Sequence, residues 1–294
     1  MEVSVVIPVN NEEKSIKNTV DEIMNSLNNT EINYEIIIVN DGSVDNTSQV
    51  IEEIHSMYKD NVNIIQNKKN GGYGFSLKRG IKSSKFSNIF ITDADGTYPN
   101  NRMAEFVKYY YENKLDMLIG ARDKKQIPLI RRPAKAVLNM FANYISGFKI
   151  PDLNSGFRIF SKSIALKYFG IIPDGFSFTS TITLSMFSEK GDIEYLPIEY
   201  NKRDGKSKIR PIKDTLNFFS LVFRTILYFN PLKIFVPFSF MVWLSGIGVF
   251  VYSYLYMDNL MDITTIVLLL TSVQIFSIGL VADLVVKRSV GGKS

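Results

Sequence analysis

Two long stretches without a charged residue, close to the C-terminus, constrain the fold of this chain more than any other feature of its sequence. They run from Ile234 to Met257 and from Ile263 to Ala282, and only DNLMD (258–262) separates the two helices that they predict. As a helix, each stretch is long enough to cross about 30 Å of hydrocarbon. The alternative is a pair of helices in a water-soluble core, but consecutive uncharged segments favour a two-helix transmembrane hairpin over residues 231–288.

The charges beside these stretches predict their orientation. Lys233 precedes the first stretch, Lys287 and Arg288 follow the second, and the connection is acidic. The positive-inside tendency puts both outer ends in the cytoplasm. The N-terminal MEVSVVIPV has no basic leader, so we expect no signal peptide. The sequence predicts an integral membrane protein with a cytoplasmic domain before the spans and a cytoplasmic tail over residues 289–294.

The first 120 residues alternate between apolar runs and helical patterns. The predicted strands cover residues 3–9, 34–43, 61–67, 88–95 and 116–122, with a later one at 193–200. The predicted helices cover residues 13–27, 47–58, 74–84 and 100–112. This alternation predicts an α/β domain over residues 1–210, with right-handed crossovers and a mostly parallel sheet covered on both faces.

Residues 211–230 predict a juxtamembrane amphipathic helix. Ile212, Leu216, Phe219 and Phe223 share one face, and polar residues lie on another. Such a helix, leading directly into a span, is expected to lie in the membrane interface. The alternative is a helix packed on the preceding domain.

The composition narrows the chemistry. The chain has no cysteine and one histidine, His55, in the polar context EEIHSMYK. A bound metal would therefore have oxygen ligands, which suits Mg²⁺ or Mn²⁺ better than zinc. The net charge of +5 is unevenly spread, because residues 201–213 form a basic cluster just before the predicted interfacial helix.

Polar residues follow three of the predicted strands where each one ends. Asn10, Asn11 and Glu12 follow the first, Asp41 and Gly42 the second, and Asp93 and Asp95 the fourth. Ligands of such sheets bind beyond the carboxyl ends of the strands. Any one of these groups alone is compatible with a turn or a helix cap, but together they predict a ligand site.

Asp93 and Asp95 form the most specific pair. On an extended strand, residues two apart point to the same side, so the two carboxylates converge if the strand continues that far. A divalent cation relieves the repulsion between them, and Mg²⁺ commonly takes one or two carboxylates plus substrate phosphates. A cap of the next helix is the alternative.

Four segments in order, VSVVIPVNNEE, IIIVNDGSVDNT, GGYGFSLKRG and ITDADG, resemble inverting nucleotide-sugar glycosyltransferases of the glycosyltransferase-A fold. DLNSGFRIFSK (152–162) and RDGKSKI (203–209) are similar to polyprenyl-phosphate glycosyltransferases of the dolichol-phosphate mannose or glucose synthase type. The resemblance implies transfer of one hexose from a GDP-mannose or UDP-glucose type donor to a polyprenyl or dolichyl phosphate, with inversion. One departure is GGYG followed by Phe75, where relatives often have Gly-x-Gly.

The resemblance also implies roles for single residues. The nucleotide sugar would contact Pro8, Asn10, Glu12, Asp41, Asp93, Arg122 and Ser155. The metal would be held by Asp93 and Asp95, which with Arg122 form the implied catalytic set. The acceptor phosphate would contact Arg131 (or Arg132), Arg158, Arg203, Ser207 and Lys208.

The chemistry of the acceptor supports the basic cluster independently. A phosphate monoester has a second pKa of about 6, so it is largely a dianion at neutral pH and needs cations rather than a general base. Arg203, Lys206, Lys208 and Arg210 precede the predicted interfacial helix, where a lipid headgroup would lie. An ordinary solvated face is the alternative for this cluster.

Other function classes fit less well. A nicotinamide oxidoreductase would have G-x-G-x-x-G after the first strand, and a P-loop would end in Gly-Lys-Ser/Thr; neither is present. A processive polysaccharide synthase would need more spans and a Gln-x-x-Arg-Trp motif, but the single tryptophan, Trp243, lies within the first span. A non-catalytic membrane scaffold would be expected to lose the two carboxylates. The expected partners are the sugar nucleotide, the lipid phosphate and the membrane, with no nucleic acid, and a homo-oligomer stays open.

Overall fold

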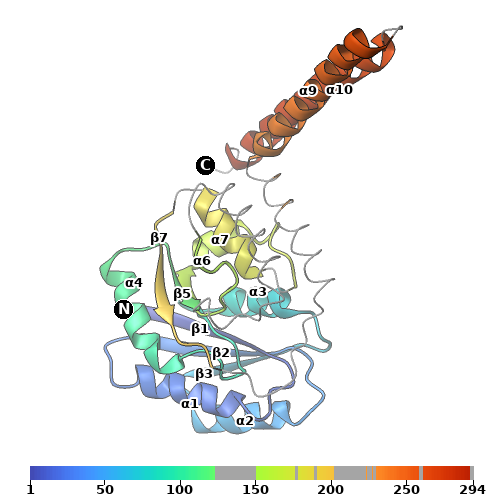
Figure 1. Cartoon of the computed structure of the whole chain (residues 1–294). Coiled ribbons are helices and arrows are strands. Elements are labelled where there is room, and N and C mark those ends of the chain that lie inside the picture. The colour runs from blue at the N-terminus through green and yellow to red at the C-terminus, as the bar shows by residue number, and fades with distance from the viewer. Residues whose placement is uncertain are drawn as a thin grey trace. The chain divides into compact units, whose positions relative to one another are not determined.

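The computed structural model describes residues 1–122, 150–175, 178–188, 191–201, 223, 227, 230–257 and 261–291. It divides into two compact units, Met1–Phe218 and Phe219–Ser294. Figure 1 shows the elements of both units.

The first unit is a layered α/β domain. Its strands are β1 (Glu2–Val9), β2 (Asn33–Asn40), β3 (Val62–Gln66), β4 (Asn88–Ile91), β5 (Met117–Arg122), β6 (Arg158–Ser161) and β7 (Ile193–Ile198). Its helices are α1 (Ile16–Leu27), α2 (Thr47–Met57), α3 (Tyr73–Ser83), the short 3-10 helix η1 (Asn100–Arg102), α4 (Met103–Glu112), α6 (Lys162–Lys167) and α7 (Phe178–Ser188).

The strands form one sheet in the order β3-β2-β1-β4-β6-β5-β7. Strands β1 to β4 are parallel to one another, and β5 is parallel to β7. In the described part of the chain, β6 alone runs antiparallel to its neighbours, β4 and β5. The predicted mostly parallel α/β sheet is therefore confirmed, and the carboxyl ends of the six parallel strands lie along one edge.

Helices cover both faces of the sheet because its central strands are apolar on both sides. Val5, Ile7 and Ile36 belong to the core that α1, α2 and α4 cover. The alternate residues point the other way: Gly80 of α3 lies so close to Val6 that an added Cβ would be 2.3 Å from a methyl group of that valine. Figure 1 shows α1 and α2 on one side of the sheet and α3, α6 and α7 on the other.

The second unit is a hairpin of α9 (Leu232–Tyr256) and α10 (Asp262–Gly291). Small residues let the helices approach closely, as transmembrane helix pairs do: an added Cβ at Gly279 would lie 2.5 Å from Cβ of Phe235. The most apolar 18-residue windows of the two helices have mean hydropathies of 2.1 and 2.2, and the larger apolar side chains are mostly exposed. At 1.5 Å per residue, 25 residues extend about 37 Å. Both helices are candidate membrane spans, and their exposed apolar surface argues against the alternative of water-soluble core helices.

Candidate active site

Asp41, directly after β2, holds the glycine-rich loop that leads into α3. Its buried carboxylate accepts hydrogen bonds from the backbone N–H groups of Gly71 and Gly72, each at 2.9 Å, and from Asn67 Nδ2 at 2.7 Å. No pattern in the sequence marks Asn67 as a partner of Asp41. The predicted nucleoside residue therefore also positions the loop at the edge of the sheet.

The glycines of this loop allow close contact with residues 173–175. Gly72 has φ +99°, and an added Cβ would lie 2.6 Å from the carbonyl oxygen of Asp174. An added Cβ at Gly74 would lie 2.3 Å from the carbonyl oxygen of Pro173. The backbone N–H of Phe75 donates to Asp174 O at 3.0 Å. These contacts explain why glycine is needed at positions 72 and 74 of the GGYG segment without any contact to a phosphate.

The residues that follow β1 lie beside those that follow β2. Asn10 Nδ2 donates to the carbonyl oxygen of Asp41 at 2.9 Å. The backbone N–H of Glu12 donates to Thr47 Oγ1 at 2.9 Å, and its carboxylate accepts from Ser15 Oγ at 3.0 Å. Pro8, within β1, is half-buried and pairs with Val39. The structure thus brings the predicted Asn10, Glu12 and Asp41 to one edge.

Asp93 and Asp95 follow β4, but the geometric reason for their predicted convergence is wrong. The strand ends at Ile91, so neither aspartate is on an extended strand. Asp95 lies in a turn, where its Oδ1 accepts from the backbone N–H of Thr97 at 3.2 Å and from Thr97 Oγ1 at 2.6 Å. Asp93 Oδ1 accepts from the Tyr73 hydroxyl at 2.9 Å. A chain bend, rather than the alternation of a strand, sets the directions of both half-buried side chains.

Asp93 is enclosed by residues from two other segments. An added Cβ at Gly156 would lie 2.9 Å from Asp93 Oδ1 and 3.0 Å from the Tyr73 hydroxyl oxygen. The backbone N–H of Gly156 donates to the Tyr98 hydroxyl at 2.7 Å, which holds this segment in place. Burial, reinforced by Asp93, raises the pKa of Tyr73 well above its ordinary value, so Tyr73 stays a protonated donor to the carboxylate. The sequence had not singled out Tyr73 or Tyr98.

We expect Tyr73→Phe to weaken turnover in the presence of Mn²⁺ or Mg²⁺ while the protein stays folded. A hydrogen bond to a charged group contributes about 1.5–3 kcal/mol, so kcat/KM for the donor should fall about 10- to 100-fold. The Mn²⁺ concentration for half-maximal activity should rise. Tyr58→Phe is the matched control, because the Tyr58 hydroxyl donates to Asp21 at 3.0 Å outside this site. Identical metal titrations for both variants would contradict a positioning role for Tyr73.

We also expect Gly156→Ala to displace the Asp93 carboxylate, because the new methyl group would lie only 2.9 Å from Asp93 Oδ1. A misplacement of about 1 Å can cost up to about 10²-fold in rate, so kcat/KM should drop by about one to two orders of magnitude. Gly170→Ala is the control, since an added Cβ there meets no described atom within 4 Å. Equal kinetics of the two variants would show that Asp93 tolerates displacement.

Arg122, the last residue of β5, forms a two-point ion pair with Asp152. Its Nε and Nη2 donate to the Asp152 carboxylate at 2.6 and 3.0 Å, and the guanidinium lies 5.2 Å from the centre of the Tyr200 ring. The side chain of Arg122 is 23% exposed and that of Asp152 only 2%. Burial by itself lowers the pKa of Arg122, but Tyr98 and Asp152 outweigh it and hold that pKa above its ordinary value. Asp152 also accepts from the backbone N–H of Asn154 at 3.2 Å.

Arg158 begins β6 and is completely buried. Its guanidinium donates to the carbonyl oxygens of Ser155 (2.8 Å from Nε), Leu153 (3.3 Å) and Thr179 (3.0 Å), and also to the Thr183 hydroxyl. Ser155 is buried as well, and its hydroxyl accepts from the backbone N–H of Phe157 at 3.3 Å. Since the donors of Arg158 are used inside the protein, we leave it out of the acceptor phosphate site.

Asp93 and Asp95 fit a divalent cation that also binds substrate phosphates. Among the described residues, no group of three or more His, Cys, Asp or Glu side chains could hold a metal by itself. Two carboxylates completed by a diphosphate are a usual ligand set for Mg²⁺. The hydrogen bonds from Tyr73 and Thr97 orient the two carboxylates, and each carboxylate has about four acceptor positions in all.

Some predicted residues lie outside the described part of the chain. They are Arg131, Arg132, Arg203, Ser207 and Lys208, together with most of the predicted interfacial helix 211–230. Their predicted roles stay predictions.

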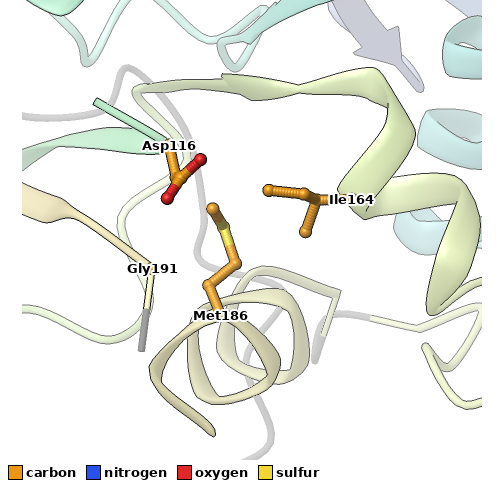
Figure 2. A pocket seen from close by; sticks show the side chains of 4 residues that line it. All are labelled: Asp116, Ile164, Met186 and Gly191. Carbon is orange, nitrogen blue, oxygen red and sulfur yellow. The ribbon is translucent and has the colours of Figure 1, made fainter. Parts of the chain in front are cut away.

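A small pocket lies at the opposite edge of the sheet. Asp116, Ile164, Met186 and Gly191 line this pocket (Figure 2). Its volume is about 150 Å³. Asp116 precedes β5, and its carboxylate accepts from the backbone N–H of Asp192 at 3.0 Å. Ligand pockets usually measure about 300–1,000 Å³, so this pocket is too small for a sugar nucleotide and lies at the wrong edge.

The sheet and its carboxyl-edge site define a glycosyltransferase-A fold, which solved structures share. Glucosyl-3-phosphoglycerate synthase from Mycobacterium tuberculosis, solved with Mn²⁺, UDP and glucosyl-3-phosphoglycerate, has a TM-score of 0.55 and 17% identity, covering 77% of this chain and 78% of that one. TarS 1–349 from S. aureus with UDP-GlcNAc has a TM-score of 0.54 and 19% identity, covering 77% and 67%. At these identities the likeness establishes the fold alone.

The sequence was compared with models of protein families. The family model for glycosyl transferase family 2 matches residues 4–169, and the family model for the GtrB C-terminal hairpin matches residues 230–287. The chain therefore belongs to glycosyl transferase family 2, and it is a glycosyltransferase.

Two relatives confirm the predicted resemblance to polyprenyl-phosphate glycosyltransferases. UDP-N-acetylglucosamine–dolichyl-phosphate N-acetylglucosaminyltransferase from Methanococcus voltae is 32% identical over 182 residues, covering 55% of this chain and 70% of the relative. Dolichyl-phosphate beta-glucosyltransferase from Dictyostelium discoideum is 26% identical over 182 residues, and the match covers 56% of each protein.

Proposed function

We propose that this protein transfers one hexose from a nucleotide-diphosphate sugar to a polyprenyl or dolichyl phosphate, with inversion, at the cytoplasmic membrane face. The observation that carries the proposal is the union, in one chain, of a family 2 glycosyltransferase domain and two apolar helices with exposed apolar side chains. An enzyme anchored in this way meets its acceptor within the membrane, and the names of the two relatives support a lipid phosphate.

The donor half of the proposed site lies at the carboxyl ends of β1, β2 and β4. Pro8, Asn10, Glu12 and Asp41 would contact the nucleoside, and Asp93 and Asp95 would hold Mg²⁺ or Mn²⁺ on the diphosphate. A bound cation would neutralise the charge that grows on the leaving diphosphate. Tyr73 and Thr97 keep the two carboxylates oriented for that task.

Arg122 would supply a fixed positive charge to the reacting phosphates. Nε and Nη2 of Arg122 both donate to the Asp152 carboxylate, so the guanidinium is already oriented before substrate arrives. Preorganised charges of this kind stabilise a developing negative charge without reorganising during the reaction. Ser155, in the neighbouring segment, is buried, and its contact with the sugar stays a prediction of the resemblance.

The acceptor half needs cations and no general base. A phosphate oxygen of the lipid attacks the anomeric carbon from the side opposite the leaving diphosphate, which inverts that centre. Because the acceptor is already a dianion at neutral pH, no proton has to be removed first. Arg131, Arg203, Ser207 and Lys208 would hold this phosphate.

Lys208→Ala and Arg203→Ala are expected to raise the KM for the lipid phosphate about tenfold or more, with a much smaller change in the KM for the donor. Loss of one charged contact of about 1.5–3 kcal/mol accounts for this size. Lys108→Ala, at an exposed position of α4, serves as the control. An effect confined to the donor would contradict the acceptor role.

A donor screen tests the proposed function as a whole. The purified full-length protein would be incubated with Mn²⁺ or Mg²⁺, a short polyprenyl phosphate and a panel of UDP- and GDP-linked sugars. Transfer of a single sugar to the lipid from one donor, with inverted anomeric configuration, is the expected result. A polymeric product, or no lipid product from any donor, would overturn it.

A further inference from the structure

The two helical layers of the first unit carry opposite charge. The helices on one face, α1, α2 and α4, contain the carboxylates Asp21, Glu22, Glu52, Glu53, Glu105 and Glu112 against the lysines Lys17 and Lys108. On the other face, α3 and α6 contain Lys78, Arg79, Lys82, Lys162 and Lys167 and no acidic residue, and α7 has no charged residue. Charge is thus distributed unevenly between the two helical layers of this domain.

The basic layer is continuous across α3 and α6, although the contacting residues Ser84 and Lys162 are 78 positions apart in sequence. Lys162 Nζ donates to the carbonyl oxygen of Ser84 at 2.6 Å, and Lys82 Nζ lies 5.9 Å from the centre of the Phe169 ring. Residues 61–92 and 153–173 contain no Asp or Glu. Asp174 meets this layer through an ion pair with Lys78 at 2.8 Å.

Apolar side chains are exposed within the same layer. Phe75 on α3 is 37% exposed, and Leu166 on α6 is 42% exposed. Lys82, Lys85 and Lys167 are exposed, and each ammonium group lies within 5.2 to 5.9 Å of an aromatic ring centre. We call the surface formed by Phe75, Lys78, Lys82, Lys85, Lys162, Leu166 and Lys167 the α3–α6 basic face.

We infer that the α3–α6 basic face docks on the anionic headgroups of the bilayer that anchors the chain. Clustered lysines near a membrane are attracted by the negative surface potential of anionic lipids. Long lysine stems over apolar and aromatic groups suit an interface, since their charged ends reach the headgroups while the stems cover apolar surface. The exposed Phe75 and Leu166 favour a lipid interface over a nucleic acid. The inference rests on α9 and α10 spanning a membrane, not on the identity of the transferred sugar.

The chain has no native cysteine, which permits a direct test. Ser83→Cys on α3 and Ser56→Cys on α2 are matched exposed positions on opposite faces of the sheet. Each full-length variant would carry a nitroxide label and be reconstituted into nanodiscs of phosphatidylcholine with or without phosphatidylglycerol. Relaxation of the nitroxide by a lipid-bound Ni²⁺ chelate then reports its distance from the headgroups. Co-elution of the protein with the nanodiscs, after all detergent has been removed, separately tests whether α9 and α10 anchor it in the membrane.

We expect stronger relaxation at position 83 than at position 56 in discs with phosphatidylglycerol, and loss of that difference in discs without it. Raising the salt to 1 M, which shortens the Debye length from about 8 to about 3 Å, should have the same effect. The double variant Lys82→Gln with Lys85→Gln should also remove the difference, whereas Lys17→Gln with Lys108→Gln should preserve it. Equal relaxation at both positions, or a difference independent of lipid charge, would overturn the inference.

Discussion

Replacing Asp95 with Asn is expected to reduce kcat by at least about 10²–10³-fold while the protein stays folded, a loss of the size seen when one preorganised electrostatic contact to a transition state is removed. Asn keeps the shape of the side chain and an oxygen that can accept from Thr97, so the turn that holds position 95 should survive. The variant loses the negative charge that would bind the cation beside the leaving diphosphate. Turnover with a saturating donor, together with the melting temperature, measures both parts of the expectation.

Asp60→Asn is the matched control for this variant, because Asp60 is an exposed acid in the turn before β3. It should retain the kinetics of the unmodified protein. If Asp95→Asn turned over at an undiminished rate, the assignment of the metal to the Asp93–Asp95 pair would fail. If it unfolded, Asp95 would be a structural residue of the turn, and Tyr73→Phe would then remain as the test of the pair.

The parallel strands could be predicted from the sequence because each is marked by a local pattern of apolar residues. β1 and β2 contain runs of Val and Ile, β4 is NIFI, and each strand is followed directly or within two residues by polar groups. The parallel arrangement then puts these polar ends at one edge without further information. Strand β6 escaped prediction because it begins with a buried arginine and runs against the pattern of alternation.

The finer structure of the site could not be predicted because its contacts join residues far apart in the sequence. Tyr73 lies 20 residues from Asp93, and Arg122 lies 30 residues from Asp152. No local pattern marks either pair, and each depends on how separate loops meet at the sheet edge. The predicted strand extension through Asp95 failed for a local reason: the chain bends after Ile91, and Thr97 holds the bend through Asp95.

Arg158 shows how a motif can carry a residue for reasons of folding rather than binding. The resemblance implied a contact with the acceptor, but its guanidinium joins the 153–155 segment to α7 from inside the domain. Burial lowers the pKa of Arg158 below its ordinary value, which reflects the cost of placing a cation there. The contacts with carbonyl oxygens offset that cost.

Replacing Arg158 with Met is therefore expected to destabilise the protein strongly. The carbonyl oxygens of Leu153 and Ser155 would each lose a buried donor, at about 1–3 kcal/mol apiece. Removing the buried charge recovers part of this, so we expect a net loss of about 2–4 kcal/mol. For a domain of this size, that lowers the melting temperature by about 5–15 °C. Thermal unfolding of the full-length protein in detergent measures the change when it is followed by tyrosine fluorescence, since the single tryptophan, Trp243, lies in α9.

Arg102→Met separates this role from a general effect of losing an arginine. Arg102 is 34% exposed and pairs with Glu105 at 2.7 Å, an i,i+3 ion pair of the kind that contributes at most about 1 kcal/mol. Its melting temperature should change little. A normal melting temperature for Arg158→Met, combined with a raised KM for the lipid phosphate, would instead support the contact that the resemblance implied. A lowered melting temperature with an unchanged acceptor KM in the folded protein would establish that Arg158 acts by fixing the 153–155 segment, and through it Gly156, against Asp93.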